Sequence, residues 1–250
     1  MTLQSLALLV AMMTVITPAL GQPDTADSYG QWMEQPQSEW PQITMVSQIE
    51  YTDAEHPIAG CGFLLDTGDE ILAATAKHVL IFFKSPTMES VDFAGSLKAW
   101  RMFPKNSPSD TVLIDRLINT DSSESLEEVP AKSDWLLFTL SHRTPDVQPL
   151  RLRTDPLEAG EPIYIIGWRY SDVDCPQVIY QGEYVKEEDG TLIVTAEELA
   201  DNTMPGLSGS PVIDSQGYVI GLMSQKAGDR QRLSSLDYPR RILEERKRPR

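Results

Sequence analysis

Three short motifs carry the side chains that could do chemistry in this chain. They are Thr75-Ala76-Lys77-His78, Ser133-Asp134-Trp135-Leu136-Leu137 and Pro205-Gly206-Leu207-Ser208-Gly209-Ser210-Pro211. A serine hydroxyl is a weak nucleophile at neutral pH, so it needs a base to take its proton and a third group to orient that base. The motifs therefore predict that Ser208 is a catalytic nucleophile, that His78 is its base, and that Asp134 orients His78.

The glycines around Ser208 predict a site for a developing negative charge. Gly206 lets the backbone turn tightly, which leaves the amides of Gly206 and Ser208 free to donate to an oxyanion. Gly209 gives clearance beside the nucleophile. The expected chemistry is acyl transfer with an oxyanion hole made of the Gly206 and Ser208 amides.

These motifs, in the order His, Asp, Ser, resemble those of the chymotrypsin-like (trypsin-fold) serine peptidases. The resemblance covers residues 60–228, and the ending Gly209-Ser210-Pro211 is similar to the bacterial, glutamyl-endopeptidase-like branch. In α/β-hydrolases the serine comes first and lies in Gly-x-Ser-x-Gly, whereas Ser210 takes the place of that second glycine here. The resemblance implies a serine endopeptidase whose active site lies in a cleft between two β-barrels.

The resemblance also implies substrate-binding residues, which fall on Asn202, Thr203, Met223 and Ser224. Asn202 stands where trypsin-like enzymes have the aspartate that selects Arg or Lys. Met223 stands where glutamyl endopeptidases have a histidine that binds a carboxylate, although a place in the strand core is an equal interpretation. Ser224 coincides with the family serine that hydrogen-bonds the catalytic aspartate. We therefore expect a neutral residue before the scissile bond.

Two departures from the family pattern keep a second interpretation open. Leu207 occupies the site of the aspartate that pairs with a newly cut N-terminal amine, so we expect no activation of that kind. In the family, the strand that binds substrate begins with a glycine. This chain has Lys226-Ala227-Gly228 at that place instead. The alternative is a catalytically silent trypsin-fold protein that binds a peptide or protein partner. A structure in which His78 cannot reach Ser208 would favour it.

The other histidines and acidic residues predict no further catalytic or metal group. His56 and His142 lie in polar segments and are expected in exposed loops. No histidine has the spacing of a zinc site, so we expect no metal and no cofactor. Asp115 is the alternative to Asp134 as the orienting carboxylate. Asp134 is preferred because it directly precedes an apolar strand, whereas Asp115 is expected to pair with Arg116 or to face solvent.

The chain has two cysteines, Cys61 and Cys175. Cys61 stands where the family has a cysteine on the strand that leads to the catalytic histidine, but the position of the family's partner cysteine is Val79. Cys61 therefore either pairs with Cys175 or remains free, because the sequence does not supply the Cα separation that a disulfide requires.

Short apolar runs separated by turn sequences must position these motifs. The first set is Ile43 to Tyr51, Gly62 to Leu65, Ile71 to Ala74, Leu97 to Phe103, Thr111 to Ile118 and Trp135 to Leu140. The second set is Leu150 to Leu152, Pro162 to Trp168, Val178 to Lys186, Thr191 to Ala196, Gly209 to Ile213 and Tyr218 to Ser224. Such spacing predicts antiparallel barrels.

We therefore expect an all-β fold of two antiparallel six-stranded β-barrels, the trypsin-like double barrel, with a short C-terminal helix. The peptidase domain spans residues 43–236, with barrels at about 43–140 and 149–228. Residues 237–250 are the C-terminal helix and a basic tail. We expect this tail to be a solvated helix end or a frayed terminus, with docking to an anionic surface as the alternative.

The N-terminal segment predicts export. Residues 1–21 contain no charged side chain and end in Ala19-Leu20-Gly21, which suits a cleaved secretory signal. The apolar run is shorter than the ~20 residues that span a bilayer, so we expect no stable membrane insertion once the signal is cleaved. Residues 22–42, rich in Gln, Pro, Asp and Ser, are predicted to be a linker or pro-segment. The mature chain would then be secreted or periplasmic.

The net charge limits the class of partner. The chain carries a formal net charge of −16 at pH 7. Sequence-independent binding of nucleic acid requires clustered positive charge, so we expect none. The expected partner is a peptide or protein substrate, and the sequence says nothing about the oligomeric state.

Overall fold

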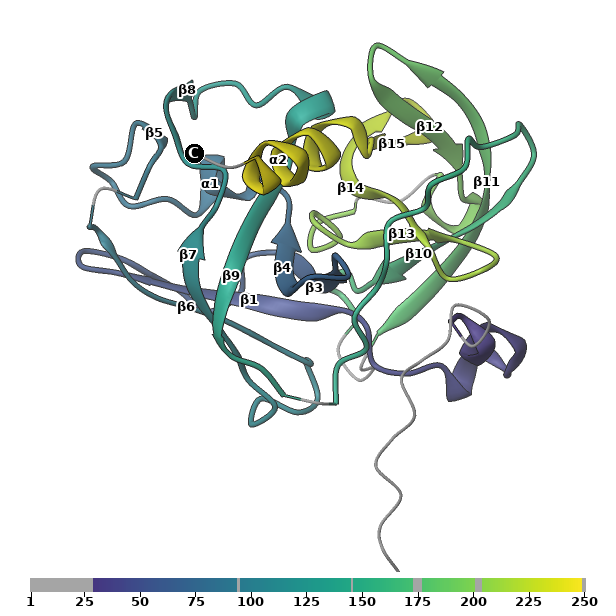
Figure 1. Cartoon of the computed structure of the whole chain (residues 1–250), viewed down its shortest axis with the longest axis horizontal. Helices are drawn as coiled ribbons and strands as arrows, with labels where there is room; N and C mark the ends of the chain where they lie inside the picture. The colour runs from purple at the N-terminus through teal and green to yellow at the C-terminus, as the bar shows by residue number, and fades with distance from the viewer. Residues whose placement is uncertain (1–28, 94, 145, 173–176, 201–203, 249–250) are drawn as a thin grey trace, which may run out of the picture.

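Two barrels of antiparallel strands lie side by side, with a C-terminal helix across their junction (Figure 1). This computed structural model describes residues 29–93, 95–144, 146–172, 177–200 and 204–248. The expected all-β double barrel with a C-terminal helix is confirmed. None of the helices in these ranges is long and apolar enough to cross a membrane.

The first barrel contains six strands, and each overlaps one of the apolar runs of the first set. They are β1 (Met45–Tyr51), β3 (Cys61–Asp66), β4 (Ile71–Thr75), β6 (Leu97–Phe103), β7 (Val112–Leu117) and β9 (Leu136–His142). Their order is β1-β3-β4-β9-β7-β6, and pairing of β6 with β1 closes the ring. A short strand, β2 (Glu55–His56), adds to β1.

The second barrel also closes with six strands, in the order β10-β11-β12-β15-β14-β13. They are β10 (Pro162–Gly167), β11 (Val178–Glu188), β12 (Thr191–Thr195), β13 (Pro211–Asp214), β14 (Val219–Ala227) and β15 (Arg230–Ser234). The β11–β12 hairpin turns through Asp189 and Gly190, with φ of 52° and 73°. Positive φ at both positions is the requirement of a type I′ turn.

The prediction of a strand at Leu150 to Leu152 is wrong, and the sixth strand is β15. Leu150 and Leu152 form only isolated bridges, to Leu65 and Val219. β15 was not predicted because its sequence contains the charged residues Arg230 and Arg232. Between them, Gln231 is fully buried and accepts a hydrogen bond from Ala196 N at 2.8 Å. The second barrel therefore extends to Ser234 rather than to residue 228.

Short elements connect and cover the barrels. They are the 3-10 turns η2 (Gln31–Glu34), η3 (Gln37–Glu39), η4 (Ala131–Ser133) and η5 (Glu197–Leu199), helix α1 (Val79–Phe82), and the two-stranded ribbon of β5 (Ser90–Val91) and β8 (Asp121–Ser125).

The described part of the predicted linker or pro-segment, residues 29–42, packs on the second barrel. Trp40 is only 8% exposed, and its ring contacts those of Trp32 and Tyr164 with both centroid distances at 5.2 Å. Tyr29 donates to the carbonyl of Gly217 at 3.1 Å. The predicted signal and residues 22–28 lie outside the described residues.

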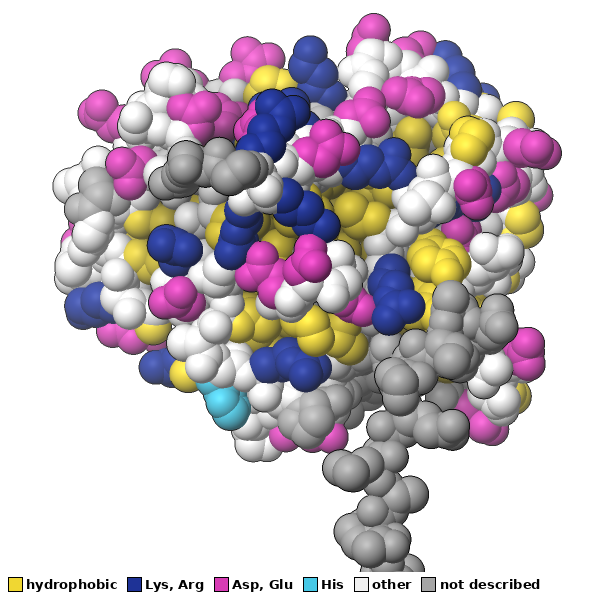
Figure 2. Space-filling view, in the orientation of Figure 1, with side chains coloured by type: hydrophobic (Ala, Val, Ile, Leu, Met, Phe, Trp, Pro, Cys, Tyr) yellow, Lys and Arg dark blue, Asp and Glu magenta, His cyan; other side chains and the backbone are white. Residues whose placement is uncertain are grey.

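Helix α2 (Asp237–Lys247) begins where the sequence predicted, with Pro239 in its first turn. Its last turn is tied to the β3–β4 turn by Arg246 to Glu70 at 3.1 Å and by Lys247 to Asp69 at 2.7 Å. Cations mix with carboxylates on this face (Figure 2), so the described part of the basic tail is partly neutralised in place.

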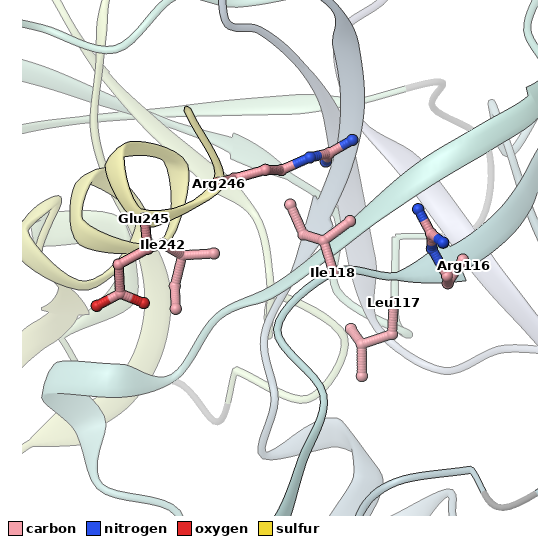
Figure 3. Close-up of a pocket in the computed structure, with 6 residues that line it drawn as sticks. All are labelled: Arg116, Leu117, Ile118, Ile242, Glu245 and Arg246. Carbon is pink, nitrogen blue, oxygen red and sulfur yellow. The ribbon is translucent and has the colours of Figure 1, made fainter. Parts of the chain in front are cut away.

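A groove of about 650 Å³ separates α2 from β7 and the residues after it (Figure 3). It is lined by Arg116, Leu117, Ile118, Ile242, Glu245 and Arg246. None of these six residues is hydrogen-bonded to His78, Asp134 or Ser208.

Candidate active site

Adjacent strands of the first barrel bring His78 and Asp134 together. β4 and β9 are antiparallel, and Thr75 at the end of β4 pairs with Leu136 at the start of β9. His78 follows β4 and stands at the N-terminal boundary of helix α1, while Asp134 ends the 3-10 turn η4 just before β9. The antiparallel pairing therefore places both side chains at one end of the barrel.

Ser208 reaches this pair from the second barrel. Its Oγ lies 2.7 Å from His78 Nε2, and His78 Nδ1 lies 2.6 Å from Asp134 Oδ2. Asp134 Oδ1 accepts a second hydrogen bond, from the His78 backbone amide, at 2.7 Å. The side chain of His78 is 13% exposed and that of Asp134 is 1% exposed, so the chain of hydrogen bonds runs from a partly open serine to a buried carboxylate.

The second barrel also supplies partners to Asp134. Ser224 on β14 donates to Asp134 Oδ2 at 2.5 Å, the contact that the family resemblance implies. The Asp134 amide donates to Ser234 Oγ on β15 at 3.2 Å. A buried carboxylate is costly unless hydrogen bonds satisfy it, and here donors from both barrels hold it in one orientation.

The turn that carries Ser208 lies close against the first barrel. The Cys61 amide donates to the Ser208 carbonyl at 2.8 Å. Gly209 has φ of 83°, and a Cβ there would lie 2.3 Å from the Cys61 carbonyl oxygen and 2.5 Å from Thr75 Oγ1. Only glycine fits this approach.

The same turn leaves two amides available for an anion. Gly206 has φ of 108°, and neither its amide nor that of Ser208 donates a hydrogen bond to any residue that the structure describes. The intervening Leu207 amide does donate, to the Met204 carbonyl at 3.1 Å. The Leu207 side chain is fully buried in the core of the second barrel, so it contributes to packing there.

Cys61 is a free, fully buried thiol, and Cys175 lies outside the described residues. The Cys61 thiol donates to the carbonyl of Gly206 at 3.1 Å. Burial raises the pKa of Cys61 to about 11. The thiol therefore stays protonated beneath the turn that carries the candidate oxyanion amides.

A family model described as a trypsin-like peptidase domain matches residues 60–222. That range contains His78, Asp134 and Ser208. The chain belongs to the trypsin-like peptidases.

Solved structures agree with the fold of this trypsin-like domain. The active form of the Rv3671c protease from M. tuberculosis is similar with a TM-score of 0.55 and 13% identity, over 97% of this chain and 96% of that chain. An inactive form of the same protease, with its serine changed to alanine, gives a TM-score of 0.52 and 13% identity, over 94% and 100%. No curated protein matches the sequence.

Of the predicted substrate-binding residues of the trypsin-like domain, Asn202 and Thr203 lie outside the described residues. Met223 is 3% exposed and packs in the core of the second barrel, which favours its interpretation as a core residue. Ser224 contacts Asp134 as described above.

The rival residues lie apart from the site of the trypsin-like domain. Asp115 is exposed on β7 and accepts a hydrogen bond from Thr139 at 2.9 Å. His142 is exposed as expected, but it lies at the end of strand β9 rather than in a loop. The expectation of an exposed loop at His56 is wrong, because this residue is half-buried on β2 and packs against the rings of Tyr51 and Phe83.

One buried group beside His78 was missed by sequence reasoning. Lys77 is fully buried, and its Nζ lies 2.7 Å from both carboxylate oxygens of Glu124. The available signal was a charged residue between the apolar run Ile71 to Ala74 and the apolar start of α1. Its partner could not be found in this way, because Glu124 is 47 residues away in the chain.

Proposed function

We propose that this trypsin-like domain is a serine endopeptidase that hydrolyses peptide bonds through an acyl-enzyme. The observation that carries the proposal is the unbroken chain of hydrogen bonds from Ser208 Oγ through His78 to Asp134, with distances of 2.7 and 2.6 Å. A nucleophile, a base and an orienting carboxylate in this arrangement are the requirements of serine hydrolysis.

In the first half of the reaction, Ser208 Oγ attacks the carbonyl carbon of the scissile bond. His78 Nε2 takes the hydroxyl proton, and Asp134 stabilises the imidazolium by accepting the Nδ1 hydrogen bond. The negative charge on the substrate oxygen is stabilised by the amides of Gly206 and Ser208. His78 then gives its proton to the leaving amine, the C–N bond breaks, and an ester to Ser208 remains.

In the second half, water replaces the amine. His78 removes a proton from the water as its oxygen attacks the ester carbon, and the proton passes to Ser208 Oγ when the ester bond breaks. The products are a carboxylic acid and the regenerated serine. Each step needs only His78 for proton transfer, so the proposal requires no metal or cofactor.

A His78 that cannot reach Ser208 would favour the alternative of a silent, peptide-binding protein, and so would a lack of labelling by a fluorophosphonate. The separation of 2.7 Å between His78 Nε2 and Ser208 Oγ gives that alternative no support. The amides of Gly206 and Ser208, which donate to none of the described residues, favour the enzyme as well, because a pure binding surface does not require oxyanion donors.

The proposed function includes export and a substrate preference. The uncharged apolar segment of residues 1–21 supports a secretory signal, and mass spectrometry of exported protein should find a mature start near Gln22.

The ending Gly209-Ser210-Pro211 supports the glutamyl-endopeptidase-like branch. A neutral residue before the scissile bond is preferred over Arg or Lys, because Asn202 offers no carboxylate and an unpaired buried cation is costly. A peptide-library cleavage profile dominated by Arg would contradict that preference alone.

A fluorophosphonate probe tests the nucleophile directly. The wild-type protein should be labelled and should cleave a peptide library, whereas Ser208→Ala should fold and show neither activity. Loss of Ser208 or of His78 should each cost several orders of magnitude in kcat, and the double variant should lose little more, because such residues act as a unit. Ser141→Ala, an exposed serine on β9, is the matched control and should behave as wild type. Wild-type turnover by Ser208→Ala would refute the assignment.

A further inference from the structure

A fully buried lysine lies directly before His78 and has a partner on the C-terminal helix. Lys77 Nζ lies 2.7 Å from both oxygens of Glu124 and 3.4 Å from the hydroxyl oxygen of Tyr238. The ammonium also lies 4.7 Å from the centre of the Tyr238 ring. The charge is thus compensated by Glu124 on β8, and Tyr238 on α2 accepts one more hydrogen bond from it.

The same hydroxyl is linked through Asn119 to the segment that follows Asp134. Tyr238 accepts a hydrogen bond from Asn119 Nδ2 at 3.2 Å. Asn119, which is 5% exposed, also donates to the Trp135 carbonyl at 2.8 Å and accepts from the Leu137 amide at 3.0 Å. The Tyr238 hydroxyl therefore links the neighbour of His78, through Lys77, to the neighbours of Asp134, through Asn119.

The residues just before α2 hold Asp134 from a further side. Ser234 Oγ accepts from the Asp134 amide at 3.2 Å, and the Ser235 carbonyl accepts from Trp135 Nε1 at 3.0 Å. The chain then enters α2, and Tyr238 follows three residues after Ser235. The start of α2 is thus placed against both segments that carry the candidate catalytic residues of the first barrel.

We propose that Tyr238 is a positioning residue of the active site, which acts through Lys77 and Asn119 to fix His78 against Asp134. The inference rests on the proposed function. A buried ammonium is stable only if its protons have partners, and Glu124 and Tyr238 supply them. The main-chain link from the Lys77 amide to the Asp134 carbonyl is long, at 3.4 Å. The side-chain contacts of Lys77 therefore add to the hydrogen bonds by which the His78 amide and ring already hold Asp134.

Tyr238→Phe removes the hydroxyl and keeps the ring that packs under Lys77. Because a displacement of about 1 Å at a reacting group costs up to roughly 100-fold in rate, we expect kcat per labelled active site to fall by about 10-fold to 100-fold. KM should stay within about twofold, since the Tyr238 hydroxyl bonds to Lys77 and Asn119 and to neither Met223 nor Ser224, the two described residues proposed to bind substrate. The matched control is Tyr164→Phe, on β10, whose hydroxyl has no hydrogen bond to any described residue. It should leave kcat unchanged.

A proton NMR measurement separates positioning from folding and from turnover. The proton between His78 Nδ1 and Asp134 should give a far-downfield resonance, which Tyr238→Phe should shift and Tyr164→Phe should not. An unshifted resonance with wild-type kcat in Tyr238→Phe would overturn the inference, and so would a loss of activity matched by a loss of labelled sites. If the wild-type protein neither turns over nor reacts with fluorophosphonate, the proposed peptidase function fails. A shifted resonance in Tyr238→Phe would still support the positioning role in that case.

Discussion

Among the single residues of the site, Cys61 shows most clearly how surroundings control reactivity. Its thiol is fully buried, donates to the Gly206 carbonyl and has a pKa raised to about 11 by burial. The thiolate is the reactive form of cysteine, so a raised pKa suppresses alkylation and oxidation together. The thiol can therefore support the Ser208 turn without competing with its hydroxyl as a nucleophile.

We predict that Cys61 resists alkylation at pH 8. In a Cys175→Ser variant, iodoacetamide should modify the folded protein at least roughly 100-fold more slowly than the urea-unfolded protein, from the change in thiolate fraction alone. Mass spectrometry over time measures both rates, and equal rates would contradict the prediction.

The thiol of Cys61 ionises at lower pH in the unfolded protein than in the folded one. The contribution of Cys61 to the free energy of unfolding is therefore intact below the ordinary thiol pKa and falls as pH rises toward 11.

Sequence reasoning located His78, Asp134 and Ser208 because each lies in a contiguous motif with a chemical requirement. It left the state of Cys61 open, because the contact that defines it joins residues 145 positions apart. It also missed the partners of Lys77 for the same reason. The catalytic roles themselves stay predictions until the Ser208 and His78 variants are measured.

At the scale of elements, the turn that carries Ser208 is the most constrained. Gly209 combines φ of 83° with a close approach to Cys61 and Thr75 on the first barrel. Gly228, in the β14–β15 turn, also has positive φ, at 67°, but a Cβ there would meet nothing within 4 Å. The pair separates the cost of backbone conformation from the cost of steric overlap.

We predict that Gly209→Ala destabilises the protein far more than Gly228→Ala. The second change should lower the free energy of unfolding by about 1 to 2 kcal/mol, the cost of a left-handed conformation with a side chain. The first should exceed it by at least about 2 kcal/mol, because the Cys61 carbonyl must shift and the Cys61–Ser208 hydrogen bond must lengthen. Urea titrations of both variants provide the comparison. Equal losses of unfolding free energy in the two variants would contradict the prediction, because they would show that the close contact between residue 209 and Cys61 relaxes without cost.

The strands were predictable where apolar runs lay between turn sequences, as in β4 and β9. β15 was not, because the charged residues Arg230 and Arg232 interrupt a strand whose other residues are buried. Leu150, which is buried, and Leu152, which is partly buried, show the opposite case, because their segment makes only isolated bridges. Local composition therefore predicts burial better than it predicts pairing.

At the scale of the whole molecule, the two barrels are joined by a shared core cluster, although the second barrel also has a cluster of its own. The largest buried cluster contains residues of the first barrel together with Ile166, Ile213, Val219 and Leu222 of the second. The candidate site also takes His78 and Asp134 from one barrel and Ser208 from the other. Neither barrel can lose its structure without exposing apolar surface of its neighbour.

We predict a single cooperative unfolding transition. Far-UV circular dichroism, tryptophan fluorescence and residual peptidase activity should change at the same urea concentration, because the shared core couples the barrels. Resolved transitions for fluorescence and circular dichroism would show that the barrels unfold separately. The Ser208→Ala variant, followed by the two optical probes, controls for self-cleavage during the titration.

The contact of Cys61 with the Ser208 turn has a consequence for how such proteins diverge. The amide of Cys61 binds the Ser208 carbonyl, and its carbonyl limits residue 209 to glycine. The position of Ser208 therefore depends on a backbone segment of the other barrel. A chimera that exchanges whole barrels between relatives would separate these two parts, whereas one that transfers β3 together with residues 205–209 would keep them matched. Strand β3 and residues 205–209, although distant in sequence, must therefore change together if the active site is to keep its geometry.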